Sequence, residues 1–256
     1  MYKRQFEDRT TGEVRTAGAE EYLFDGRVFG ELPDGTPYSY DTFAANPNLG
    51  STGGTFLTNG DRQAESFSAA ITLTKRLSNR WMARGFFNYV FKEEWGVPSS
   101  YFNYNDPNRT GPEVIDGQGL SVMNSKWQWN LNGMYQVAPE RAWGFNVAAN
   151  LTGREGFPIT YTRNKPGSDG IGRTIMVVED VDDYRYDDVF VADLRIEKEF
   201  AATGNLGLTL SVDAFNIFNE GYVLSRNTNL NSGSANWVNA TLSPRVYRLG
   251  VRISWR

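Results

Sequence analysis

Residues 126–137 read KWQWNLNGMYQV, and apolar and polar side chains alternate along this stretch. One face holds Trp127, Trp129, Leu131, Gly133, Tyr135 and Val137, and the other holds Lys126, Gln128, Asn130, Asn132 and Gln136. A period of two indicates an extended strand, because successive side chains point to opposite faces of a sheet. A soluble β-sandwich would bury the apolar face in a core. A transmembrane barrel would turn that face toward lipid and the polar face toward a wet lumen.

Similar alternation recurs in segments that start near residues 65, 81, 143, 190, 206 and 246. The sequence therefore predicts an all-β fold, an antiparallel meander of about seven strands. Turn residues predict short connections at 78–79, 138–140 and 202–204, and long ones at 95–123, 158–184 and 220–243. This regular change of length is typical of outer-membrane barrels, which have tight periplasmic turns and long extracellular loops.

Composition excludes several classes of function. The chain has 256 residues, a net charge of -4, and neither cysteine nor histidine. Disulfides, thiolate metal sites and histidine-based catalysis are therefore excluded, and the charge gives no reason to expect a nucleic-acid partner. No stretch approaches the roughly 18 apolar residues of a transmembrane helix. We expect no enzyme activity, no cofactor and no metal site.

Three segments differ in character along the chain. Residues 1–5 (MYKRQ) resemble a translated sequencing adapter, and we expect them to be a non-native leader; an ordinary native start is the alternative. Residues 6–63 are irregular and rich in turn residues, which predicts a strand remnant followed by a long extracellular loop. Residues 64–256 carry the regular alternation and form the expected barrel segment.

The tryptophans favour a membrane over a soluble core. Trp81, Trp143 and Trp255 lie beside expected short turns or at the chain end, and Trp95 and Trp127 lie beside long loops. Indole is favoured at a membrane interface, where the ring is apolar and its N–H reaches water. A sandwich core would instead place tryptophan near strand centres. We expect these five residues to form two girdles.

The polar faces carry full charges. An arginine or lysine on the lipid side costs about 2–4 kcal/mol at mid-bilayer, so charged side chains should face a lumen. The expected lumen-facing residues are Arg84, Lys126, Asp193, Arg195, Glu197, Asp213, Arg248 and Arg252. Opposite charges on neighbouring strands would pair. We expect either a structural network or contacts along a substrate path.

Acidic residues also gather in the expected loops. One run comprises Glu179, Asp180, Asp182, Asp183, Asp187 and Asp188, and a second group comprises Asp106, Asn108, Glu113 and Asp116. Oxygen-rich loops can bind calcium, but the spacing differs from that of an EF-hand. The alternative is a solvated outer loop, and we expect no metal there.

The last two expected strands resemble a known family. Residues 213–219 read DAFNIFN and residues 243–256 read SPRVYRLGVRISWR, which is similar to the C-terminus of TonB-dependent outer-membrane receptors. Residues 26–30 (GRVFG), 74–82 (TKRLSNRWM) and 193–198 (DLRIEK) resemble the Oar-like branch, whose members carry a carboxypeptidase-regulatory-like domain. The resemblance extends over about residues 22–256.

The resemblance implies a fold, a location and a function. Family members close 22 strands around a plug that bears the TonB box, and they import scarce, bulky ligands such as siderophores, cobalamin or oligosaccharides. With about seven strands and no plug, the chain is expected to be the C-terminal part of such a barrel. Implied partners are outer-membrane lipid, the TonB system through the missing plug, the barrel-assembly machinery through the last strand, and the ligand. The alternatives are a surface adhesin and a soluble carbohydrate-binding β-sandwich.

Overall fold

The computed structural model describes residues 2–15, 22–57, 65–94, 125–166, 172–178, 183–203 and 206–255. Within these ranges the regular structure consists of β-strands without helices, and every strand pairing is antiparallel. The predicted all-β, antiparallel fold is therefore confirmed. No described segment is a helix with the length and hydropathy needed to cross a membrane.

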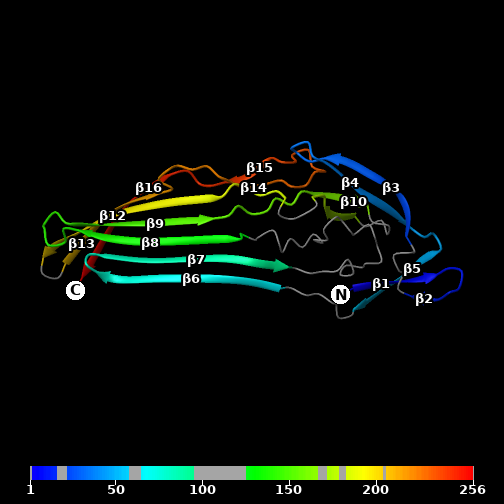
Figure 1. Ribbon diagram of the computed structural model, residues 1–256, viewed down its shortest axis with the longest axis horizontal. Coiled ribbons are helices and arrows are strands. Elements are labelled where there is room, and N and C mark those ends of the chain that lie inside the picture. Colours follow the sequence, from blue (N-terminus) through cyan, green and yellow to red (C-terminus); the bar gives the residue numbers. More distant parts are fainter. Residues whose placement is uncertain are drawn as a thin grey trace.

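One sheet of seven strands dominates the molecule (Figure 1). It contains β6 (Glu65–Ser78), β7 (Trp81–Glu94), β8 (Trp127–Val137), β9 (Phe145–Arg154), β12 (Val189–Thr203), β13 (Leu206–Phe215) and β16 (Val246–Trp255). Their spatial order is β16-β13-β12-β9-β8-β7-β6, so each strand pairs with the next one along the chain. The seven-stranded meander that the alternation predicts is confirmed. β6 and β16 form the edges of the described sheet.

Short and long connections alternate along the sheet. β6 and β7 are joined at Asn79 and Arg80, whose φ angles of 50° and 70° give a tight hairpin turn with the twist of the flanking strands. The connection from β8 to β9 occupies residues 138–144 and is longer than the expected turn at 138–140. Arg141 N–H donates to Ala138 O and Gly144 N–H donates to Arg141 O, so the chain makes two turns before β9 starts. The expectation that β9 begins at Trp143 is wrong, since Trp143 lies within this connection.

On β13 the polar side chains are buried and the apolar ones between them are exposed. In β13 the polar residues Thr209, Ser211 and Asp213 are buried, whereas Leu210 and Val212 between them are exposed. On the edge strand β16, Leu249 and Trp255 are each 80% exposed. Soluble antiparallel sheets usually cover their apolar face. On β13 and β16 the large apolar side chains are therefore exposed, whereas on β13 the polar ones are not.

The amino-terminal region is more regular than its sequence indicates. Residues 6–63 were expected to hold one strand remnant and a loop, but this is wrong. The region contains β2 (Val14–Arg15), β3 (Tyr22–Glu31), β4 (Pro37–Ala45) and β5 (Leu49–Leu57), and β1 (Tyr2–Asp8) pairs with β2 and β5. A register shift between Phe24 and Gly26 interrupts the alternation of β3, which hides the strand from a period-two search. The native or non-native origin of residues 1–5 stays a prediction.

The long connections of the sheet fold into a second unit. Residues 158–184 and 220–243, expected to be loops, contain β10 (Thr162–Pro166), β11 (Gly172–Met176), β14 (Val223–Arg226) and β15 (Val238–Thr241). We call the β3–β4 hairpin together with residues 155–166, 172–178, 183–188 and 216–245 the cap. In Figure 1 the β3–β4 hairpin and β10 lie toward the end of the sheet opposite the carboxyl terminus.

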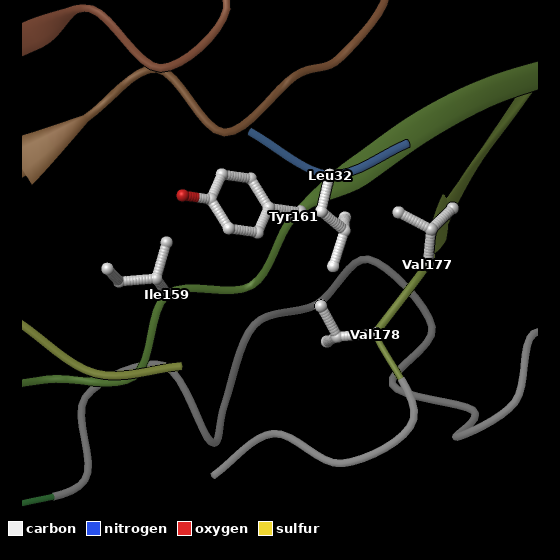
Figure 2. Close-up of a cluster of buried hydrophobic side chains, with 5 residues drawn as sticks. All are labelled: Leu32, Ile159, Tyr161, Val177 and Val178. Atoms are coloured by element: carbon white, nitrogen blue, oxygen red, sulfur yellow. The ribbon is translucent and has the colours of Figure 1, made fainter. Parts of the chain in front are cut away.

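The cap contains the hydrophobic cluster of the described chain. Its buried members are Leu32, Ile159, Tyr161, Val177 and Val178, shown in Figure 2. Leu32 comes from the β3–β4 turn, while the other four come from the connection between β9 and β12. The cluster therefore joins segments that are more than a hundred residues apart. It packs as a soluble core does, with apolar side chains inside.

Candidate functional site

An ion-pair network crosses the polar face of the sheet at β12, β13 and β16. Asp213 is central, with Arg195 Nη1 at 3.4 Å from Oδ1 and Arg248 Nε at 3.0 Å from Oδ2. The three residues align in register, since Arg195 pairs with Asp213 and Asp213 pairs with Arg248. The Asp213 side chain is only 7% exposed, so the two guanidinium groups replace much of the water that its carboxylate would otherwise contact.

Glu197, two residues after Arg195 on β12, extends the same network toward Arg252. Arg195 Nη2 lies 2.6 Å from Glu197 Oε2, and Arg252 Nη2 lies 3.7 Å from Oε1. Arg195 thus bridges two carboxylates. The arginines on β16 are 61% and 68% exposed at Arg248 and Arg252, so their outer edges stay open to solvent. The structure brings together five of the eight residues that were expected to face a lumen.

Asp193, a sixth expected residue, joins this face to the turn after β13. Its Oδ1 accepts from Asn216 N–H at 2.9 Å and its Oδ2 accepts from Asn150 Nδ2 at 3.1 Å. Asn150 in turn accepts from Asn130 Nδ2 at 2.7 Å, and Asn132 donates to Asn130. The result is a row of amides and carboxylates across β8, β9 and β12, in which buried polar atoms are hydrogen-bonded.

The turn after β13 is held by two asparagines with left-handed backbones. Asn216 and Asn219 have φ angles of 49° and 57°. Asn216 Nδ2 donates to Glu220 O and Ser243 O, and Asn216 Oδ1 accepts from Glu220 N–H. Asn219 Oδ1 accepts from Arg245 N–H at 2.9 Å. The motif at residues 216–219 therefore ties the end of β13 to the start of β16.

Arg84 and Lys126 lie apart from the ion-pair network. Arg84 lies on the same polar face, where it pairs in register with Thr74 on β6 and Asn132 on β8. Lys126 comes just before β8, and its N–H donates to Glu155 Oε2 at 2.6 Å. Both are placed by strands that are two or more positions away from β12 in the sheet. The structure therefore does not bring either residue to Asp213.

A second ion pair lies where the sheet meets the cap. Arg185 Nη1 is 3.2 Å from Glu155 Oε2, and both side chains are less than a fifth exposed. Arg185 also donates to Gly156 O at 2.8 Å, and Gly156 N–H donates to Asp188 Oδ1 at 3.2 Å. No local pattern predicts this pair, because its partners come from the two ends of one long connection.

The described tryptophans of the two expected girdles lie at strand ends or in a turn. Trp81 is the first residue of β7, Trp127 is the first of β8, and Trp255 is the last of β16. Trp143 lies in the turn before β9, and Trp95 lies outside the described residues. Trp127 packs on Phe190, with ring centroids 5.8 Å apart. Membership of a girdle stays a prediction for all five.

The cap contains a pocket of about 440 Å³. Glu31, Tyr38, Arg163 and Asn236 supply its polar lining. Arg163 Nη1 donates to Tyr38 Oη at 2.9 Å, and Tyr161 Oη donates to Asn236 Oδ1 at 3.3 Å. The volume falls in the usual range of small-molecule sites, about 300–1,000 Å³. Sequence reasoning missed this pocket, since its lining comes from segments that were expected to be loops.

Burial affects the tyrosines around the pocket. It raises the pKa of Tyr40, Tyr161 and Tyr186 above the ordinary phenol value, because the charged phenolate is disfavoured away from water. At Tyr40 the neighbouring Arg163 guanidinium opposes this rise in pKa. These phenols therefore stay protonated at neutral pH and act as hydrogen-bonding groups.

The acidic loop residues form no metal site in the described ranges. Glu179, Asp180 and Asp182 lie outside those ranges, as do Asp106, Asn108, Glu113 and Asp116. Asp183, Asp187 and Asp188 are described, and no group of three or more acidic residues gathers there as metal ligands do. The expectation that the whole run is a solvated loop without a bound metal stays a prediction.

Comparison of the chain with protein-family models, with curated proteins and with solved structures gives no match.

Proposed function

We propose that this chain is the C-terminal barrel portion of a TonB-dependent outer-membrane transporter. It would lie in the bacterial outer membrane and contribute to the import of a scarce, bulky ligand of the siderophore, cobalamin or oligosaccharide class. The observation that carries the proposal is the inverted burial of β13, where exposed Leu210 and Val212 alternate with buried Thr209, Ser211 and Asp213. Water would penalise such a surface, while lipid stabilises it.

The dimensions of the sheet support the same proposal. β16 has 10 residues, which at about 3.3 Å per residue and a tilt near 45° cross about 23 Å, close to the roughly 25 Å height of the apolar band of a barrel. The two long connections that the structure largely describes, from β9 to β12 and from β13 to β16, leave the sheet at the same end, as extracellular loops do.

The edges of the sheet favour a larger barrel. β6 and β16 each pair on one side only in the described chain, and lipid offers no partner for the free backbone groups. We propose that further strands close these edges and that the complete barrel has 22. The resemblance at residues 213–219 and 243–256 supports this number. Coupling to TonB would act through a plug, and assembly would begin at the last strand.

The polar face supports a role on a ligand path. Arg248 and Arg252 are more exposed than Asp213 and Glu197, the carboxylates with which they pair. The proposed inner wall, formed by the polar face, would therefore present guanidinium groups to the lumen. Such a wall is wet and fixed in shape. It suits passage of a polar ligand.

A fractionation experiment tests the membrane part of the proposal. An epitope inserted after Gly233, which has open space around it, would mark the protein in the bacterium that produces it. We expect the tagged protein in the outer membrane fraction, where urea should not extract it. Its mobility on denaturing gels should differ between heated and unheated samples. Recovery as a soluble, urea-sensitive monomer without detergent would contradict the proposal and favour a sandwich.

An uptake experiment tests the transport part. Cells with and without residues 64–256 would receive iron-55 siderophores, cobalt-57 cobalamin and labelled oligosaccharides, each with and without an uncoupler. We expect the deletion to abolish uptake of one ligand class, and the uncoupler to have the same effect on intact cells. Normal uptake of every class by cells lacking the segment, together with surface exposure of the tag, would point instead to an adhesin.

A further inference from the structure

The pocket of the cap is built by two distant parts of the chain. The β3–β4 hairpin supplies Gly30, Glu31 and Tyr38, and the long connections supply Arg163, Leu230 and Asn236. Figure 1 shows β3, β4 and β10 together toward the same end of the molecule. The buried cluster of Figure 2 supports this junction, since Leu32 packs with Ile159 and Tyr161.

Arg163 is held in place by its backbone and by Tyr38. Thr162, its neighbour on β10, donates its N–H to Thr228 O and accepts from Leu230 N–H, so β10 is fixed against residues 228–230. Arg163 Nη1 then donates to Tyr38 Oη at 2.9 Å. A Cβ at position 30 would collide with the Tyr38 ring, so Gly30 allows that ring to lie across β3.

The positive charge of Arg163 is not neutralised by the described part of the chain. Its Nε is buried without a hydrogen-bond partner, and no described carboxylate lies within salt-bridge distance. A partly enclosed cation without a counter-ion is unfavourable, because its lost hydration is not replaced. An anion bound in the pocket would supply the missing charge.

The pocket wall offers several side-chain hydrogen-bond donors. Tyr38 Oη accepts from Arg163, which leaves its own proton to donate, and Asn236 Oδ1 accepts from Tyr161, which leaves its amide NH2. The remaining guanidinium edge of Arg163 adds further donors. Glu31, on the exposed rim, is the one carboxylate among the lining residues.

We propose that this pocket binds an organic ligand through a carboxylate, as in a sugar acid. The carboxylate would lie against Arg163 and accept hydrogen bonds from Tyr38 and Asn236, while Leu230 and Pro33 contact the carbon skeleton. The charge of Glu31 disfavours a dianion such as phosphate. A monocarboxylate matches one guanidinium and tolerates one rim carboxylate.

The inference deepens the proposed function, on which it rests for the claim that the bound ligand is then imported. It names the chemistry of the ligand that the long loops select. Binding itself depends only on the cap. A protein that inserts into the outer membrane but ignores the carboxylate would overturn the inference alone, whereas a soluble protein that binds it would overturn the proposed function alone.

The test measures binding of D-glucuronate by saturation-transfer NMR, with the protein in outer membranes of cells that carry it. D-glucose is the neutral probe of the same shape, and inorganic phosphate, followed by its own phosphorus signal, is the rival anion. We expect glucuronate to bind at least tenfold more tightly than glucose, because a charge-assisted hydrogen bond is lost without the carboxylate. Phosphate should bind more weakly than glucuronate.

Four variants sharpen this test. Arg163→Gln should weaken glucuronate binding about tenfold or more, and Arg163→Lys should restore part of it, since lysine keeps the charge but not the planar fork. Glu31→Gln should strengthen binding a few-fold by removing a like charge. Arg27→Gln, on the same hairpin but paired with Asp41 outside the pocket, is the matched control and should change nothing.

Several results would overturn the inference. Equal affinity for glucuronate and glucose would do so, as would preferred binding of phosphate. Unchanged binding in Arg163→Gln would show that the guanidinium is not the anchor. Should Arg163→Gln fail to fold, Glu31→Gln still decides, with Arg27→Gln as its unchanged control: weaker or unchanged binding in Glu31→Gln contradicts an anionic ligand.

Discussion

Asn216 combines two features that only a few residue types can supply. Its backbone lies in the left-handed region at φ 49°, and its 5%-exposed side chain makes three hydrogen bonds to main-chain groups of Glu220 and Ser243. Asparagine tolerates this backbone better than most residues, because its short amide bonds locally. The residue therefore fixes the path from β13 toward β16.

We predict that Asn216→Ala destabilises the protein by about 2–4 kcal/mol. The left-handed backbone costs alanine about 1–2 kcal/mol, and the unpaired carbonyls add a similar amount. Urea unfolding in detergent micelles, followed by tryptophan fluorescence, measures the change. Asn216→Gly is the control, since it keeps the backbone but loses the amide, and it should fall between the two. Equal urea midpoints for all three proteins would contradict this role.

At the residue scale, sequence alone predicted faces better than contacts. Arg195, Glu197 and Asp213 were assigned to one face because a period of two fixes the side on which each residue lies. Their partners depend on register and side-chain conformation, so Arg195 bridging Glu197 and Asp213 was not specified. Arg163 was missed altogether, since its strand was expected to be a loop.

Single elements show why some strands were predicted and others were not. β8 and β13 alternate without interruption, and both were located by their pattern. β3 carries a register shift, and β10 has only 5 residues, so neither gives a period-two signal. The start of β9 was placed too early because Trp143 shares its parity while lying in the turn.

Arginine substitutions at two neighbouring positions on β6 test which face of the sheet meets lipid and which meets water. Ile71 and Thr72 are both exposed, but they lie on opposite faces of the sheet. We predict that Ile71→Arg costs about 2–4 kcal/mol in a bilayer, whereas Thr72→Arg stays within about 0.5 kcal/mol. The folded fraction in outer membranes, read from heat-dependent gel mobility, measures both. Similar tolerance of the two arginines would contradict a lipid-facing β6.

We predict that the cap loses stability at alkaline pH because its buried tyrosines ionise there. Burial raises the pKa of Tyr40, Tyr161 and Tyr186 in the folded state above the unfolded value near 10. The stabilisation is therefore complete below pH 10 and is lost as the pH rises through the folded pKa. Tyrosinate absorbance at 295 nm, recorded with trypsin sensitivity of the cap, measures this effect.

A comparison of variants controls this prediction. Tyr161→Phe removes one ionisable group and its hydrogen bond to Asn236. The free energy of unfolding of the cap should therefore fall by about 1 kcal/mol at pH 7. Between about pH 10 and 12 the variant should lose less stability than the wild type. A cap that resists trypsin equally at pH 7 and pH 12 would show that these phenols are not coupled to its folding.

The whole molecule contains two opposite kinds of packing. The cap buries Leu32, Ile159 and Val178 around a conventional core, while the sheet buries Asp213 and exposes Leu249. One solvent does not favour both arrangements. The proposed placement, with the sheet in lipid and the cap in water, would match each kind of packing with its own surroundings.

Sequence patterns predicted the sheet of this molecule but not its cap. Alternation reports which side of a strand is apolar, and connection lengths report the order of hairpins, so the seven-stranded meander followed from local signals. The cap depends on contacts between residues far apart, such as Tyr184 with Asp34 at 3.0 Å, and no local pattern encodes them. Closure of the sheet edges by further strands stays a proposal, because pairing between distant strands is likewise not encoded in a local pattern.

The central claim, that the apolar face meets lipid, is tested most directly on β16. The chain has no cysteine, so single cysteines can be placed along Val246–Trp255 without removing others. Spin labels at each position, in protein held in lipid bilayers, report collisions with oxygen and with a water-soluble nickel complex. We predict a period of two, with positions 247, 249, 251 and 253 favouring oxygen and positions 248, 250, 252 and 254 favouring nickel. Equal access to nickel along the whole strand would contradict the claim.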